Sequence, residues 1–92
     1  MTQWTMEQMR KAVTDGVHIR TPSLLDKIRT IPESTRYDLV FHLERTNTFS
    51  DAYGGGEDYK GHTEIDGEKF PVSCRRQYDM GMGSQWNVKL AS

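Results

Sequence analysis

The sequence predicts an α+β domain in which two short N-terminal helices pack on a three- or four-stranded antiparallel β-sheet. Apolar residues recur at helical spacing in the first third of the chain and alternate with polar residues through much of the remainder. An Asp-Gly pair, typical of a tight hairpin turn, separates two of the later segments. Because neither element can bury its apolar side alone, we expect the helices to cover the apolar face of the sheet.

Length and composition predict one compact domain spanning 1–92. The chain has 92 residues, of which 35% are hydrophobic and 27% charged, and two Trp, four Tyr and three Phe are available to build a core. We expect about 1–31 to be helical and about 36–92 to be mainly β.

The first helix is predicted over about 6–15. Thr5 and Gln8 have the spacing of a capping box, in which each side chain bonds the backbone of the other, and Gly16 suits a left-handed helix terminator. The apolar positions at helical spacing are Met6, Met9 and Val13.

The second helix is predicted over about 22–29. Thr21 and Pro22 suit the cap and the first helical position, because proline lacks a backbone donor that would be unpaired there. Pro32 disfavours helical geometry in the residue before it and so ends the helix. The apolar side consists of Leu24, Leu25, Ile28 and Ile31.

The segment 35–46 fits two structures. Apolar Tyr37, Leu39, Phe41 and Leu43 alternate with polar or smaller residues, which favours a strand. Pro32 and Ser34 could also start a third helix through the same residues, so both alternatives stay open.

The clearest β signal is a hairpin that turns at Asp66-Gly67. The predicted pairs are Ile65 with Glu68, Glu64 with Lys69, Thr63 with Phe70, Gly61 with Val72, and Tyr59 with Cys74. This register separates a charged face from a mostly apolar one. A final strand is predicted from the alternation of Trp86, Val88 and Leu90.

The segment 46–58 predicts a long acidic, Gly-rich loop. It combines turn-forming residues with three successive glycines, and the stretch 47–68 carries a net charge of −5 within a chain of net charge −1. Aromatic residues among acids could anchor and steer a partner with a basic surface. The predicted protein-binding residues are Phe49, Asp51, Tyr53, Glu57 and Asp58.

From this loop we predict a non-enzymatic protein-binding module, an intracellular inhibitor or adaptor. A mobile element could encode such a protein against a nucleic-acid-processing enzyme. An exposed strand edge could also pair two copies of the chain into a homodimer.

Nucleic-acid binding is the first alternative, because basic and aromatic residues on a sheet can combine phosphate contacts with base stacking. The candidate residues are Arg75, Arg76, Tyr78 and Lys89. Trp86 is in phase with the apolar face, so we expect it in the core. A small ribonuclease, with His42 or His62 as general base and an arginine stabilising phosphate charge, belongs to the same alternative.

Metal binding is the second alternative. His42 and Glu44 are two residues apart, as are His62 and Glu64, so each pair would project from one face of a strand. If the two strands were neighbours at matching height, imidazole and carboxylate ligands could surround one divalent ion.

Several other classes lack support in the sequence. No apolar run has the length of a membrane span and no signal peptide is evident, so we expect a cytoplasmic protein without a membrane partner. Cys74 is the only cysteine and is expected to be a small buried side chain. No cofactor is predicted, because Gly54, Gly55 and Gly56 are not followed by the Lys and hydroxyl pair of a phosphate-binding loop.

Overall fold

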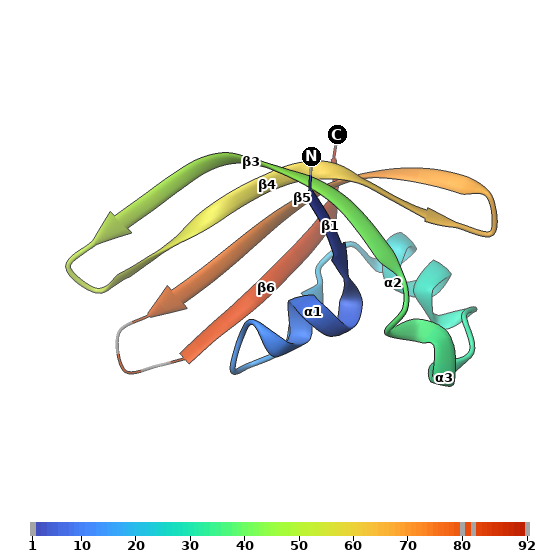
Figure 1. The fold of residues 1–92 in the computed structure, drawn as a ribbon, viewed down its shortest axis with the longest axis horizontal. Coiled ribbons are helices and arrows are strands. Elements are labelled where there is room, and N and C mark those ends of the chain that lie inside the picture. Colours follow the sequence, from blue (N-terminus) through green and yellow to red (C-terminus); the bar gives the residue numbers. More distant parts are fainter. Residues whose placement is uncertain (1, 80, 82, 92) are drawn as a thin grey trace.

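The computed structural model describes residues 2–79, 81 and 83–91 and contains one curled six-stranded sheet (Figure 1). In spatial order the strands are β1 (Thr2–Thr5), β3 (Val40–Asp51), β4 (Gly54–Ile65), β5 (Glu68–Asp79), β6 (Gly83–Leu90) and β2 (Val17–Ile19). Strand β2 joins β6 in parallel, whereas all other neighbours are antiparallel.

The predicted three- or four-stranded antiparallel sheet with two N-terminal helices is therefore wrong. The region that was expected to be helical contributes both edge strands, β1 and β2, and the sheet is mixed. These strands have only four and three residues, too few for a recognisable alternation, and they exist because they pair with residues far along the chain. The protein is mostly β.

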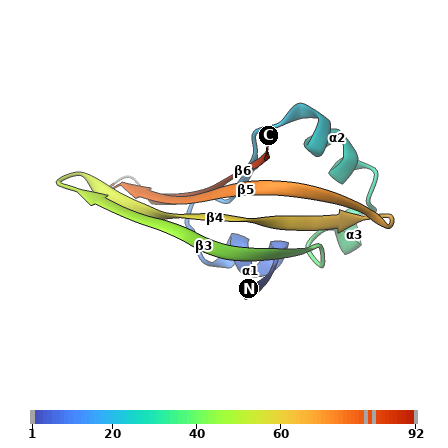
Figure 2. The ribbon, with the colours of Figure 1, turned by 90° about the horizontal axis from the view of Figure 1, so that it is seen from above.

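Three short helices lie on the concave side of the sheet (Figures 1 and 2). They are α1 (Met6–Lys11), α2 (Pro22–Arg29) and the single turn α3 (Glu33–Arg36). None of the helices in the described part of the chain is long and apolar enough to cross a membrane.

The core lies between these helices and the concave face of the sheet. Trp86, Phe41 and Met9 are its largest fully buried side chains. The other buried apolar residues are Met6, Leu24, Ile28, Leu39, Leu43, Tyr59, Ile65, Val72, Cys74 and Val88. The expectations that Trp86 and Cys74 are buried are confirmed.

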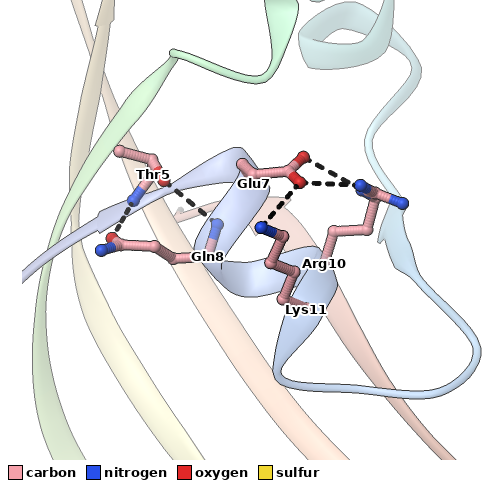
Figure 3. Close-up of polar contacts among 5 residues, drawn as sticks. All are labelled: Thr5, Glu7, Gln8, Arg10 and Lys11. Carbon is pink, nitrogen blue, oxygen red and sulfur yellow. Dashed lines mark hydrogen bonds and ion pairs between the residues drawn. The ribbon is translucent and has the colours of Figure 1, made fainter.

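Helix α1 begins at the predicted capping box (Figure 3). The backbone N–H of Thr5 donates to Gln8 Oε1 at 2.9 Å, and the N–H of Gln8 donates to Thr5 Oγ1 at 3.1 Å. Glu7 pairs with Arg10 at 2.8 Å and with Lys11 at 3.6 Å, which supports the exposed side of the helix.

The helix ends at Lys11, earlier than the predicted 15, because the next residues bond to strand β6. The N–H of Asp15 donates to the carbonyl of Ser84 at 2.7 Å, and the N–H of Trp86 donates to the carbonyl of Gly16 at 3.0 Å. Pairing with a distant strand thus replaces the last predicted turn.

The second helix has the predicted bounds, Pro22–Arg29. The open question over 35–46 has a mixed answer: the one-turn α3 precedes a strand that starts at Val40. The Asp66-Gly67 turn and all five predicted pairs of the β4–β5 hairpin are confirmed, with positive φ angles of 53° at Asp66 and 80° at Gly67.

The predicted loop over 46–58 is wrong, because these residues continue β3 and β4 as a long hairpin. A bulge between Arg45 and Asn47 separates its two halves. The glycines lie where neighbouring backbone is close: a Cβ on Gly56 would be 2.2 Å from the carbonyl oxygen of Arg76 and 2.8 Å from the Phe49 ring. Glycine here permits tight strand packing and is no sign of a loop.

Candidate functional site

The sheet has one face covered by the helices and one face without helices, here called the open face (Figure 2). Since strand side chains alternate between faces, the open face carries the residues that alternate with the buried ones. Its central members are His42 and Glu44 on β3, Asp58, Lys60 and His62 on β4, Ser73 and Arg75 on β5, and Asn87 and Lys89 on β6.

A hollow of about 400 Å³ lies on this open face. Among the residues that the structure describes, four cationic side chains line it, and Asp58 is the only carboxylate that does so. The four cations are Arg20, Lys60, Arg75 and Lys89. The hollow therefore gathers positive charge on a protein whose net charge is −1.

Lys60, Ser73 and Lys89 form one row across β4, β5 and β6. Adjacent strands are roughly 4.8 Å apart, so the two lysine backbones lie about 10 Å apart with the serine between them. Within the described residues, no carboxylate lies within 4.0 Å of either lysine amino group. Two long, flexible ammonium side chains flanking a hydroxyl can bind one anion together.

The arginines beside this row are held by neighbouring side chains. Arg75 donates to both carboxylate oxygens of Asp58, at 2.8 and 3.2 Å, and its guanidinium lies 4.6 Å from the centre of the Phe49 ring. The bonded Arg75 lowers the pKa of Asp58. Arg20 donates to Asn87 Oδ1 at 2.7 Å.

The predicted nucleic-acid-binding residues divide between the two faces. Arg75 and Lys89 line the hollow. Arg76 points to the other face, where it donates to the carbonyl of Ala12 at 3.2 Å, and Tyr78 lies on that face too. The structure therefore brings two of the four residues, Arg75 and Lys89, together in the hollow. Tyr78 and the fully buried Trp86 do not present their rings there for base stacking.

The predicted protein-binding residues also divide. Phe49 and Asp58 contact Arg75 on the open face, whereas Asp51 and Tyr53 are at the tip of the β3–β4 hairpin. Tyr53 is 80% exposed. Glu57 lies on the opposite face and accepts a hydrogen bond from another tyrosine, Tyr59. Protein binding by this segment stays a prediction.

Tyr59 connects the core to that acidic segment. Its burial, together with the hydrogen bond to Glu57, raises the pKa of the Tyr59 phenol to about 12. Cys74, which pairs with Tyr59 across the sheet, is buried, and this burial raises its thiol pKa to about 12. The thiol is therefore not a nucleophile at neutral pH.

The four predicted metal ligands share the open face. His42 and His62 are directly opposite, with ring centres 4.8 Å apart. Glu44 lies opposite Lys60, and Glu64 opposite Lys69. In residues 2–79, 81 and 83–91, no three His, Cys, Asp or Glu side chains are close enough to hold a metal ion together.

Sequence reasoning missed Arg20, Lys60, Ser73 and Asn87 as a group. The predicted register of the β4–β5 hairpin already implied that Lys60 is opposite Ser73, so this part of the site could have been found from the sequence. No sequence pattern indicated that Arg20 lies at the hollow, because it reaches the hollow through the parallel pairing of β2 with β6.

Comparison with protein-family models, with curated proteins and with solved structures finds no match.

Proposed function

We propose that the protein binds nucleic acid, with the phosphate backbone lying across the open face of the sheet. The observation that carries this proposal is the row of Lys60, Ser73 and Lys89, in which two lysines flank a hydroxyl and neither amino group has a carboxylate within 4.0 Å in the described residues. Phosphate contacts supply much of the affinity of nucleic-acid-binding proteins, and lysine and serine are common donors to phosphate oxygens.

The remaining residues of the hollow favour nucleic acid over an acidic protein as the ligand. Gln77 and Asn87 add amide groups that can bond phosphate oxygens or base edges. Protein interfaces are commonly centred on buried aromatic or apolar anchors, whereas nucleic-acid interfaces are more polar and basic. The lining side chains of the hollow are charged or polar apart from the buried Cys74.

Net acidity does not exclude this function, because a ligand responds to the local field near the surface it approaches. Charges separated by more than about 10 Å are largely screened at 0.1 M salt. The acidic residues at the hairpin tip and at the β4–β5 turn belong to other regions of the surface. Of the carboxylates in or beside the hollow, Asp58 is bonded to Arg75 and Glu44 lies opposite Lys60. Binding should therefore be confined to the hollow and should weaken strongly with salt.

The test is a salt series of fluorescence anisotropy titrations with labelled single-stranded RNA, single-stranded DNA and duplex DNA. The variant Lys60→Gln/Lys89→Gln should lose most of the affinity. For a single strand, the slope of log K against log salt should fall by about 1.4, since each lost phosphate contact contributes about 0.7.

The matched control is Lys11→Gln/Arg29→Gln, which removes the same charge from two exposed helix positions. It should bind like the unmodified protein. Equal losses in both variants would show a diffuse charge effect without a site. If no nucleic acid binds, and polyglutamate binds in a way that depends on Lys60 and Lys89, the hollow is a site for an acidic protein.

A further inference from the structure

Two histidines project next to each other from the open face, one row away from the lysine and serine row. His42 on β3 and His62 on β4 are paired directly across the sheet. Their ring centres are 4.8 Å apart and their planes differ by 22°, so the rings are stacked. Both side chains are partly exposed and accessible from solvent.

We propose that His42 and His62 chelate a first-row divalent metal ion such as Zn²⁺. Imidazole nitrogen is a preferred ligand of zinc, copper and nickel. Two nitrogens bound to one tetrahedral zinc at about 2.0–2.1 Å lie roughly 3.3 Å apart. Directly opposite strand positions have Cβ atoms about 4.5–5.5 Å apart, so rotation of the two rings brings one nitrogen of each to the ion.

The two histidines are the only protein ligands that the proposal requires. Glu44 and Glu64 lie two residues along the same strands, but each faces a lysine across the sheet. Because no third His, Cys, Asp or Glu joins the pair in the described residues, water completes the coordination. The site is independent of the proposed nucleic-acid binding and requires no other ligand.

Metal binding should also stabilise the folded chain, because the ion bridges β3 and β4 only when these strands are paired. A ligand that binds the native state alone raises the melting temperature as its concentration increases. The rise in melting temperature is therefore a second measurement of metal binding, besides the binding titration.

The test uses the full chain after chelator treatment, in buffer without nucleic acid, titrated with ZnCl₂ by calorimetry and by thermal melting. One ion should bind per chain and raise the melting temperature. His42→Gln and His62→Gln should each weaken binding at least tenfold and abolish the rise. Glutamine keeps a polar side chain on an accessible face, and circular dichroism confirms that each variant is folded.

The matched control is His18→Gln, which removes the remaining histidine of the chain. His18 lies on the edge strand β2, and its ring bonds the carbonyl of Asp15 at 3.0 Å. This variant should bind zinc like the unmodified protein. The proposal is overturned if the unmodified chain gives no heat and no melting shift, or if binding survives both the His42 and His62 replacements. Because nucleic acid is absent, either result leaves the function proposed for the lysine row unaffected.

Discussion

The same four strands are stabilised in different ways at their two ends. Near the helices, one side of the sheet is a dense apolar core; beyond them, the β3–β4 and β5–β6 hairpins extend as an arm (Figure 1). The arm consists of residues 46–51, 54–58, 75–79 and 83–85, and the rest of the sheet is here called the covered half.

On β3, the boundary between the covered half and the arm lies at the bulge between Arg45 and Asn47. In the covered half, fully buried residues such as Phe41 and Leu43 exclude water. In the arm, close glycine backbones and the contacts of Phe49 and Asp58 with Arg75 take their place. Burial therefore fixes the fold at one end, while the arm depends on cross-strand contacts and on hydrogen bonds of Arg76 and Ser84 with residues 12–15, and it presents polar groups on both faces.

The largest effect should come from breaking the covered half. Trp86 is fully buried, and its ring centre lies 5.3 Å from that of Trp4 and 5.2 Å from that of Tyr59. Trp86→Ala should lower the free energy of unfolding by about 3–5 kcal/mol. Urea unfolding followed by circular dichroism measures this loss.

The control is Tyr53→Ala at the exposed tip of the arm, which should change stability by no more than about 0.5 kcal/mol. A Trp86→Ala protein that is as stable as this control would show that the covered half is not the main source of stability.

A smaller, local effect is expected in the arm. In Gly56→Ala, the new Cβ would overlap the backbone carbonyl of Arg76, so β4 and β5 must separate there. We expect a cost of about 1–3 kcal/mol. Amide hydrogen exchange should become faster in the arm and stay nearly unchanged around Val72 and Val88.

Thr48→Ala, at an exposed arm position, is the control and should leave exchange as it is. If Gly56→Ala instead increased exchange evenly through the whole sheet, the arm and the covered half would unfold as one unit. That result would contradict their separate stabilisation.

The smallest effect should come from the junction, where Tyr59 of the covered half donates to Glu57 of the arm. Tyr59→Phe removes this hydrogen bond, at a cost of about 1 kcal/mol. The raised pKa adds a pH signature: its stabilisation is complete below the unfolded tyrosine pKa near 10 and is lost as pH rises toward 12.

Urea unfolding between pH 7 and 11 tests this point. The stability of Tyr59→Phe should fall less steeply above pH 10 than that of the unmodified protein. Both proteins should keep a decline that begins near pH 9, because Cys74 also has a raised thiol pKa. Parallel curves would mean that the folded protein does not raise the pKa of the Tyr59 phenol.

Local chemistry made part of the structure predictable. The capping box of α1, the bounds of α2 and the register of the β4–β5 hairpin depend on residues close together in the chain, and each matches the prediction. The prediction of a loop over 46–58 was wrong, because three successive glycines indicate a turn when only neighbours in sequence are considered. Across the sheet those glycines meet the backbones of β3 and β5, which no local pattern reveals.

The candidate site, like the fold, could be predicted only in part from the sequence. The local sequence predicted that Lys60 faces Ser73 and that Trp86 is buried. That His42 and Glu44 share a strand face followed only if 35–46 formed a strand, which the sequence left open and the structure decides. Only the tertiary structure decided that Lys89 completes the row, that His42 meets His62, and that Arg20 reaches the hollow. Short-range pairs follow from strand alternation and turn geometry, whereas the order of strands depends on burying one common core, a property of the whole chain.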